Sequence, residues 1–129
     1  MELLQLEDLT KEYQDVDKCD GEIVWIFSNG GKTRPVLIWK REKGRVYFLS
    51  ITTKYKENFA TQYFEIRGLK PAGLKRQSWV DLGNLRSLPT GMFLENKSGY
   101  LTDIDYARFE KAVKRFYESQ HQAFKYETA

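Results

Sequence analysis

Short apolar runs, separated by glycine, asparagine and charged residues, divide the middle of the chain into strands. The runs are rich in β-branched and aromatic residues, which favour extended backbone. Runs of this length between turn-forming residues are typical of β-strands. The segments expected to form strands are residues 22–27, 36–39, 46–52, 62–66 and 78–82, and a further apolar segment, 84–88, follows the last of them.

An acidic amphipathic helix is expected ahead of these strands. Apolar residues recur there at steps of three and four, which is the spacing of one helix face. Acidic residues fill most of the positions between them, and the Asp20-Gly21 step ends the segment. The predicted helix spans residues 3–16 and carries its apolar stripe on Leu6, Leu9, Tyr13 and Val16.

A second helix is expected after the strands. Residues 102–105 have the pattern of a capping box, so we interpret Asp103 and Asp105 as helix-capping residues rather than a catalytic pair. Most cations fall on the other face, which we interpret as solvated. The residues after Gln120 show no strong pattern. The apolar stripe comprises Tyr106, Phe109, Val113, Phe116 and Tyr117.

Together these elements predict a mainly β protein with a single core, since 129 residues suit one domain. Several short strands joined by tight turns and followed by a helix favour a small open barrel of five to seven strands. We expect an acidic helical extension over residues 1–20, a barrel with its C-terminal helix over residues 21–120, and a tail over residues 121–129.

Composition is that of an ordinary globular protein, with 30% charged and 41% hydrophobic residues. No apolar run approaches the ~18 residues of a membrane-spanning helix, and residues 1–4 lack the basic start of a signal peptide. Cys19 is the only cysteine, which excludes an internal disulfide. A cytoplasmic location is therefore expected.

Charge is distributed unevenly along the chain. The net charge is +3, but the first twenty residues hold seven acids and two bases, a balance of −5, which leaves +8 for the rest. A basic domain of this kind favours polyanions such as nucleic acid. A merely well-solvated surface is the alternative interpretation.

The inventory of reactive residues excludes most enzyme chemistries. His121 is the only histidine, which argues against a Ser-His-Asp triad or a paired-histidine nuclease. One histidine and one cysteine do not make a usual zinc site, and a Walker A phosphate loop is absent from the sequence. We therefore expect neither a metal nor a cofactor. The chemistry still open to the chain is that of arginine side chains and side-chain hydroxyl groups.

Arg34 and Thr52 are the residues best suited to that chemistry. Arg34 presents a planar, permanently charged fork that fits a phosphate, and Pro35 pushes it toward extended backbone. Thr52 ends the third predicted strand. At neighbouring strand ends, the two side chains could hold a phosphodiester and stabilise developing charge.

The order of these motifs along the chain resembles that of the MazF/PemK toxins of toxin–antitoxin pairs. The likeness spans about residues 21–118, and each motif is short, so their order and spacing carry it. The segments concerned are Gly21-Glu22-Ile23-Val24, Arg34-Pro35-Val36-Leu37-Ile38, Ile51-Thr52-Thr53-Lys54, Ser78-Trp79-Val80-Asp81 with Arg86-Ser87-Leu88, and Gly99-Tyr100-Leu101-Thr102.

This resemblance implies an SH3-like barrel with a C-terminal helix, a homodimer, and a metal-independent endoribonuclease for single-stranded RNA. It also implies an acidic antitoxin partner that blocks the RNA groove. Arg34 and Thr52 match the catalytic positions of the family, where the ribose 2′-hydroxyl attacks phosphorus. The surrounding residues expected to position or grip RNA are Lys32, Thr53, Lys54, Tyr55, Lys56, Ser78 and Arg86.

Three departures from the family pattern leave other functions open. Gly83 stands where some relatives carry an aspartate, Asp81 stands where some carry a second arginine, and the loop over residues 28–33 is short. A catalytically silent nucleic-acid- or protein-binding barrel of the same fold is one alternative. A gyrase poison is another, because a related toxin family shares the fold. The N-terminal helix is expected either to dock on the barrel or to mimic an antitoxin tail.

Overall fold

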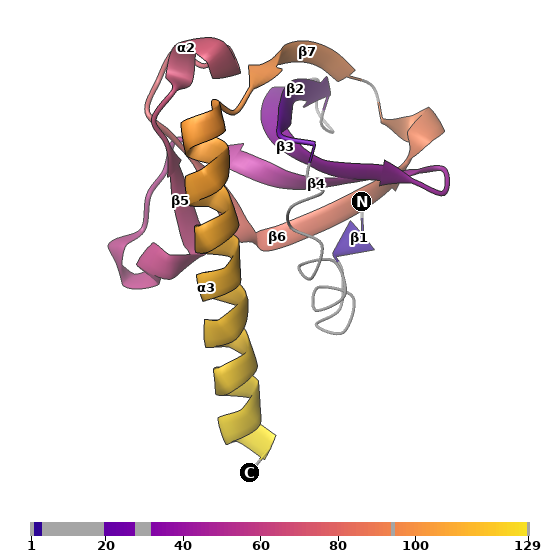
Figure 1. The fold of residues 1–129 in the computed structure, drawn as a ribbon. Coiled ribbons are helices and arrows are strands. Elements are labelled where there is room, and N and C mark those ends of the chain that lie inside the picture. The colour runs from indigo at the N-terminus through magenta and orange to yellow at the C-terminus, as the bar shows by residue number, and fades with distance from the viewer. Residues whose placement is uncertain (1, 4–19, 28–31, 94, 129) are drawn as a thin grey trace.

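The main feature of the structure, a computed structural model, is one open antiparallel sheet with a long helix beside it (Figure 1). The model describes residues 2–3, 20–27, 32–93 and 95–128. Along the sheet the order is β1-β6-β4-β3-β2-β7, and β5 pairs with β6 off this path. The prediction of a mainly β, open architecture with a C-terminal helix is confirmed. The strands are β1 (Glu2–Leu3), β2 (Glu22–Phe27), β3 (Thr33–Glu42), β4 (Arg45–Thr52), β5 (Tyr63–Ile66), β6 (Ser78–Pro89) and β7 (Glu95–Tyr100).

Strand β3 is longer than its apolar run, and this corrects the sequence-based boundaries. It begins at Thr33 and continues to Glu42, so Arg34 lies inside the strand rather than ahead of it. The reason is that β2 pairs with this polar end of the strand, with Phe27 opposite Thr33 and Ile26 opposite Arg34. The charged segment over residues 40–44 predicts a hairpin turn, but residues 40–42 also lie in the strand.

Strand β6 is one strand of 12 residues, although two separate segments were expected. It bends sharply, because Leu49 of β4 pairs with Leu85 while Ile51 pairs with Val80. Four residues, 81–84, therefore lie opposite the single residue between Leu49 and Ile51. A bulge of this kind curves the strand and re-aims its side chains. The bend lets one strand pair with β5 at its start and with β1 at its end.

Side chains on both faces of the sheet are buried, which explains why the strands contain unbroken apolar runs. On one face, Leu37 and Trp39 pack with Leu49 and with Phe109 of the C-terminal helix. Trp39 and Phe109 meet edge to face, with ring centroids 5.8 Å apart. A second buried cluster on the alternate positions comprises Val24, Ile26, Val36, Ile38, Val46, Phe48 and Phe93.

The C-terminal helix α3 (Asp103–Thr128) runs past β5 and extends beyond the sheet (Figure 1). Its start is capped as expected, because the backbone N–H of Asp105 donates to the hydroxyl of Thr102 at 3.0 Å. Residues 121–128, expected to form a tail, continue this helix. The described part of the chain holds no helix that is both long and apolar enough to cross a membrane.

The Asp105 side chain ties the helix to the chain ahead of it. It is 1% exposed and accepts hydrogen bonds from the backbone N–H groups of Arg67 (3.1 Å) and Gly68 (2.8 Å). It also pairs with Arg108 at 2.7 Å. A buried carboxylate needs such partners, so Asp105 has a structural role.

Several connections are more regular than expected. The basic residues over 54–60 predict a loop, but residues 57–60 lie in the 3-10 helix η2 (Glu57–Gln62), which also includes Gln62, expected to begin a strand. The turn after β5 contains α2 (Leu69–Ala72). A further 3-10 turn, η3 (Thr90–Met92), precedes β7. At the start of the chain, Leu3 lies in a strand rather than a helix, paired with Arg86. The rest of the predicted acidic helix (4–16) and the turn at 28–31 lie outside the described residues.

Candidate functional site

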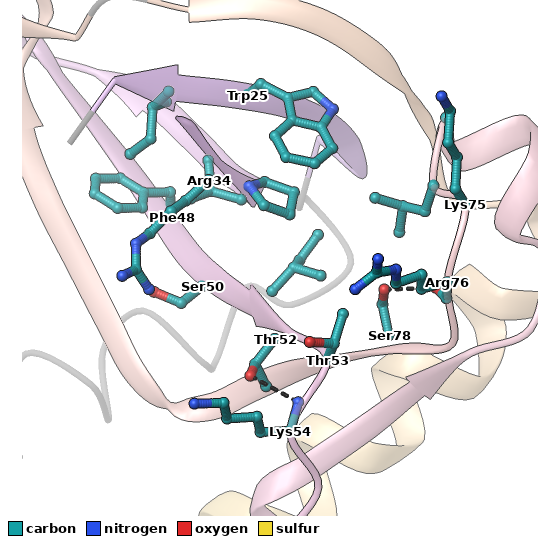
Figure 2. A pocket seen from close by; sticks show the side chains of 16 residues that line it. Trp25, Arg34, Phe48, Ser50, Thr52, Thr53, Lys54, Lys75, Arg76 and Ser78 are labelled. Carbon is teal, nitrogen blue, oxygen red and sulfur yellow. Dashed lines mark hydrogen bonds between the residues drawn. The ribbon is translucent and has the colours of Figure 1, made fainter. Parts of the chain in front are cut away.

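A pocket of about 850 Å³ opens where β3 begins and β4 ends (Figure 2). Apolar side chains from β2, β3 and β4 form part of its wall, and polar and cationic groups surround them. The chain entering β6 supplies the opposite wall, residues 73–76. Arg34 and Arg76 lie on opposite sides of the view, with the Arg34 side chain running toward Ser50 and with Thr52 and Lys54 below them (Figure 2).

The antiparallel register brings Arg34 and Thr52 to this pocket together. Val36 of β3 pairs with Ser50 of β4. Arg34 lies two residues before Val36 on β3, and Thr52 lies two residues after Ser50 on β4. Because side chains alternate along a strand, Arg34 and Thr52 point to the same face of the sheet. Both residues line the pocket, and Arg34 is exposed. The structure thus brings both residues to the lining of one pocket, while their joint contact with a phosphate and their catalytic roles stay predictions.

The Thr52 hydroxyl is oriented by its own chain. The backbone N–H of Lys54 donates to Thr52 Oγ1 at 3.0 Å. A hydroxyl that accepts one hydrogen bond in this way keeps its own proton available for donation. Thr52 is therefore able to donate a hydrogen bond to a phosphate oxygen held by Arg34.

Four cationic side chains line the pocket, and no carboxylate is present among its described lining residues. Arg34 and Lys54 come from the ends of β3 and β4, whereas Lys75 and Arg76 come from the opposite wall. Such a concentration of positive charge attracts phosphate groups. Lys75 and Arg76 were not predicted, and the only sequence signal for them is a pair of adjacent cations ahead of a strand.

The wall bearing these cations is held by contacts between α2 and β7, here called the α2–β7 clamp (Ala72, Gly73, Ser98 and Gly99). Ser98 Oγ lies 2.9 Å from the carbonyl oxygen of Ala72 and 3.2 Å from that of Gly73. Trp25 of β2, which lines the pocket, donates to the same hydroxyl from Nε1 at 3.1 Å. The wall is thus fixed to the sheet on which Arg34 lies.

Two glycines make this close contact possible. Gly73 ends α2 with a φ of 74°, a conformation that glycine adopts without strain. A Cβ on Gly99 would lie 2.0 Å from the carbonyl oxygen of Pro71, so only glycine fits there. These two positions let β7 approach the backbone that carries Lys75 and Arg76.

The other sequence-predicted site residues are divided between the pocket and its surroundings. Thr53, Lys54 and Ser78 line it. The Ser78 hydroxyl, 3% exposed, donates to the carbonyl oxygen of Arg76 at 2.8 Å, so it supports the wall. Lys32 is not among the lining residues.

Arg86 also lies outside the lining of the pocket. It pairs with Phe48 on β4 and directs its Nη2 toward Oδ1 of Asn84, 3.4 Å away. Tyr55 and Lys56 follow the pocket residue Lys54 along the chain, and both are exposed. The Tyr55 ring stacks on Trp79 with centroids 5.2 Å apart.

The two positions that depart from the family pattern lie at the bend of β6. Asp81 accepts hydrogen bonds from the side chain of Gln62 (2.8 Å), from the backbone N–H of Gly83 (3.0 Å) and from the side chain of Asn84. A Cβ on Gly83 would lie 2.8 Å from Nε2 of Gln62. Asp81 therefore holds the bend, and η2 packs closely against it.

The geometry favours the binding and stabilisation of negative charge. The described lining residues include neither histidine nor carboxylate, so they offer no side-chain base of the usual kind. Burial raises the pKa of the nearby Tyr63 phenol, and the Asp81 carboxylate adds to the shift. Tyr63 therefore stays protonated at neutral pH. Among the described residues, no cluster of three or more histidine, cysteine or acidic side chains could hold a metal ion.

Comparison with solved structures shows that the chain has the fold of MazF toxins from Mycobacterium and Deinococcus. Against the Mycobacterium tuberculosis toxin MazF-mt6 the TM-score is 0.61 at 22% identity, covering 75% of this chain and 96% of that one. Against an endoribonuclease in complex with its cognate antitoxin, from a mycobacterial species, the TM-score is 0.58 at 16% identity, covering 76% and 92%.

A MazE–MazF complex from Deinococcus radiodurans gives a TM-score of 0.54 at 21% identity, covering 74% of this chain and 89% of that one. At these identities the comparisons establish the shared fold, which confirms the predicted resemblance at that level. No protein-family model matches the chain, and no curated protein does either.

Proposed function

We propose that the chain is a toxin-type endoribonuclease that cleaves single-stranded RNA without a metal ion. The observation that carries this proposal is a pocket lined by both Arg34 and Thr52 together with three further cations, with no carboxylate among its described lining residues. The MazF fold supports it, because similar folds include an endoribonuclease bound to its antitoxin.

The proposed reaction is an internal transfer of the phosphodiester. The ribose 2′-oxygen forms a bond to phosphorus, and the bond from phosphorus to the 5′-oxygen breaks. The products are a 2′,3′-cyclic phosphate and a 5′-hydroxyl. The 2′-hydroxyl releases its proton to water, and the leaving oxygen takes a proton from water or from Thr52, which then regains one from water. This chemistry requires a 2′-hydroxyl, so the substrate is RNA rather than DNA.

Arg34 and Thr52 divide the stabilisation of the transition state in this proposal. The guanidinium of Arg34 binds two non-bridging oxygens through its planar fork. Thr52 donates its remaining proton to the phosphate, or passes it toward the leaving oxygen. Lys54, Lys75 and Arg76 line the same pocket and would hold the neighbouring phosphates of the strand.

The same pocket would receive an acidic antitoxin segment. Carboxylates and phosphates both bind arginine forks, so a protein segment rich in Asp and Glu would compete with RNA. Solved complexes of the same fold contain an antitoxin or the MazE partner. We propose that the chain acts as a homodimer in the cytoplasm, as the family resemblance implies.

The decisive experiment incubates the purified chain with a long single-stranded RNA in the presence of EDTA. Wild type should cleave it and leave 2′,3′-cyclic phosphate ends. Arg34→Ala should be slower by about 10²–10³-fold, because it removes a group aimed at developing charge. Arg34→Lys should be intermediate, since it keeps the charge and loses the fork. Arg115→Ala, an exposed arginine of α3, is the matched control and should be unchanged.

A catalytically silent RNA-binding barrel is the second candidate. It is favoured by the absence of a histidine or carboxylate among the described lining residues. Intact RNA with folded wild type, together with binding that Arg34→Ala weakens, would establish this alternative and reject the nuclease. Cleavage that EDTA abolishes, or that Arg34→Ala leaves unchanged, would also reject the proposed mechanism.

A further inference from the structure

Three aromatic rings gather beside the pocket and form what we call the aromatic shelf (Tyr55, Tyr63 and Trp79). Tyr55 stacks nearly parallel on Trp79, with centroids 5.2 Å apart and planes inclined by 20°. It also meets Tyr63 edge to face at 6.0 Å. Tyr55 nevertheless keeps 42% of its surface exposed. A large ring held rigidly in solvent reach has already lost the freedom that binding would otherwise remove.

The β-sheet register places this shelf next to the proposed catalytic threonine. Thr52 of β4 pairs directly with Trp79 of β6, so their side chains lie on the same face of the sheet. Tyr55 follows Thr52 by three residues and Lys54 by one. A phosphate bound at Thr52 and Lys54 therefore has its neighbouring nucleotide within reach of the shelf, because nucleotides in single strands lie several ångströms apart.

The charge around the shelf selects the class of ligand. Lys54 and Lys56 flank Tyr55 in the chain, and both are exposed. Proteins that bind single-stranded nucleic acid usually place aromatic rings beside a row of cations. The bases stack on the rings, and the phosphates of the strand contact the cations. A peptide offers far fewer flat rings to such a surface than a nucleic-acid strand does, because its Asp and Glu side chains have none.

We infer that the aromatic shelf stacks the nucleobase next to the phosphate held at Thr52 and Lys54. This inference rests on the proposed function for the identity of that phosphate. Tyr55 is the contacting ring, whereas Trp79 and Tyr63 support it from behind and from the edge. Stacking strength grows with ring area, so the shelf favours a purine over a pyrimidine at this position.

Binding to uncleavable strands tests the inference separately from catalysis. The probes are single-stranded 2′-deoxy hexanucleotides, which lack the attacking hydroxyl, carrying adenine, thymine or abasic sites throughout. Wild type should bind adenine more tightly than thymine, and thymine more tightly than the abasic strand. Tyr55→Ala should weaken binding of the adenine strand by roughly 5- to 100-fold, with little change for the abasic strand. Tyr55→Phe should bind like wild type, and Tyr100→Ala, an exposed tyrosine of β7, is the matched control.

Three results would overturn the inference. Tyr55→Ala could leave the adenine strand unaffected, or weaken the adenine and abasic strands equally. It could also weaken binding of a hexaglutamate peptide while sparing all three oligonucleotides, which would assign the shelf to a protein partner. Thermal unfolding of each variant identifies any loss of fold, and Tyr55→Phe keeps the ring if Tyr55→Ala is unstable.

The two proposals fail in different ways. If wild type does not cleave RNA but still binds adenine strands in a manner dependent on Tyr55, the nuclease is rejected and the shelf stands. If wild type cleaves RNA in EDTA while Tyr55→Ala binds every strand normally, the shelf is rejected and the nuclease stands. Arg34→Ala should lose cleavage and still prefer the adenine strand over the abasic one.

Discussion

Replacing one cation of the pocket wall should change the salt dependence of nucleic-acid binding by a calculable amount. Four cations line the pocket: Arg34, Lys54, Lys75 and Arg76. If each neutralises one phosphate, the logarithm of the binding constant for a single strand falls with the logarithm of salt concentration with a slope of about −2.8. Between 50 and 200 mM salt, the affinity should then drop by about 50-fold.

Arg76→Gln removes one of these charges and keeps most of the side chain. The slope should become about −2.1, so the same change in salt should weaken binding by roughly 20-fold. Fluorescence anisotropy of a labelled 2′-deoxy hexanucleotide at five or six salt concentrations measures both slopes. Arg115→Gln on α3 changes the net charge equally and lies outside the pocket lining, so it should keep the wild-type slope.

A wild-type slope near zero would refute the assignment of the pocket to phosphates. An equal change in slope for Arg76→Gln and Arg115→Gln would show that overall charge, rather than the pocket, governs binding. Arg76 lies on a wall held by the α2–β7 clamp, and its removal should leave the fold intact because its side chain is exposed.

Further predictions concern stability and pH. Asp105→Ala should lower the free energy of unfolding, measured in urea, by about 3 kcal/mol, because it leaves two backbone N–H groups and a partly buried arginine without their carboxylate. Asp103→Ala, at an exposed position, should lower it far less. Equal losses for the two variants would contradict the structural role of Asp105. Gly99→Ala should lower the free energy of unfolding by about 2 kcal/mol or more, measured as a lower Tm, because its Cβ would overlap the Pro71 carbonyl oxygen. Gly91→Ala is the control, because a Cβ there would meet open space. Because burial raises the pKa of Tyr63 in the folded state, its contribution to stability is fully present below about pH 10 and is lost as pH rises through the higher folded pKa. Tyr63→Phe should therefore lose less stability than wild type between neutral and strongly alkaline pH, and identical urea midpoints across that range would contradict this.

Strand positions could be predicted where burial alone determines them. The apolar run over residues 22–27 matches β2, and the run over residues 46–52 falls one residue short of β4. Strand β3 was underestimated because its pattern marks only the buried centre, while pairing with β2 extends it through Thr33 and Arg34. Strand β6 was divided at Gly83 because a glycine usually signals a break, whereas here Asp81 stabilises a bend within one strand.

The residues of the candidate site, like the strands, could be predicted from sequence only where local patterns determine their positions. Arg34 and Thr52 could be expected near each other from sequence because a hairpin joins their strands. Their register could not be predicted, because a bulge between Ile38 and Lys40 shifts the pairing by one residue. Lys75 and Arg76 could not, because their place depends on contact between α2 and β7, in which Ser98 lies 26 residues after Ala72. Contacts between distant segments leave no periodic signal near either partner. The aromatic shelf was missed in part for this reason, since Tyr55 follows β4 and meets Trp79 only because the end of β4 pairs with the start of β6.

The α2–β7 clamp has a consequence for the entropy of binding. A cation on a mobile loop must be ordered when it meets a phosphate, and each ordered side chain costs about 0.5–1.5 kcal/mol, in addition to the backbone. Here the backbone that carries Arg76 is already held by the hydroxyls of Ser78 and Ser98. Only the side-chain rotamers remain to be fixed. Two serine hydroxyls that are engaged with backbone carbonyl groups, and so do not bind the phosphate themselves, would thereby determine how tightly a neighbouring arginine binds it.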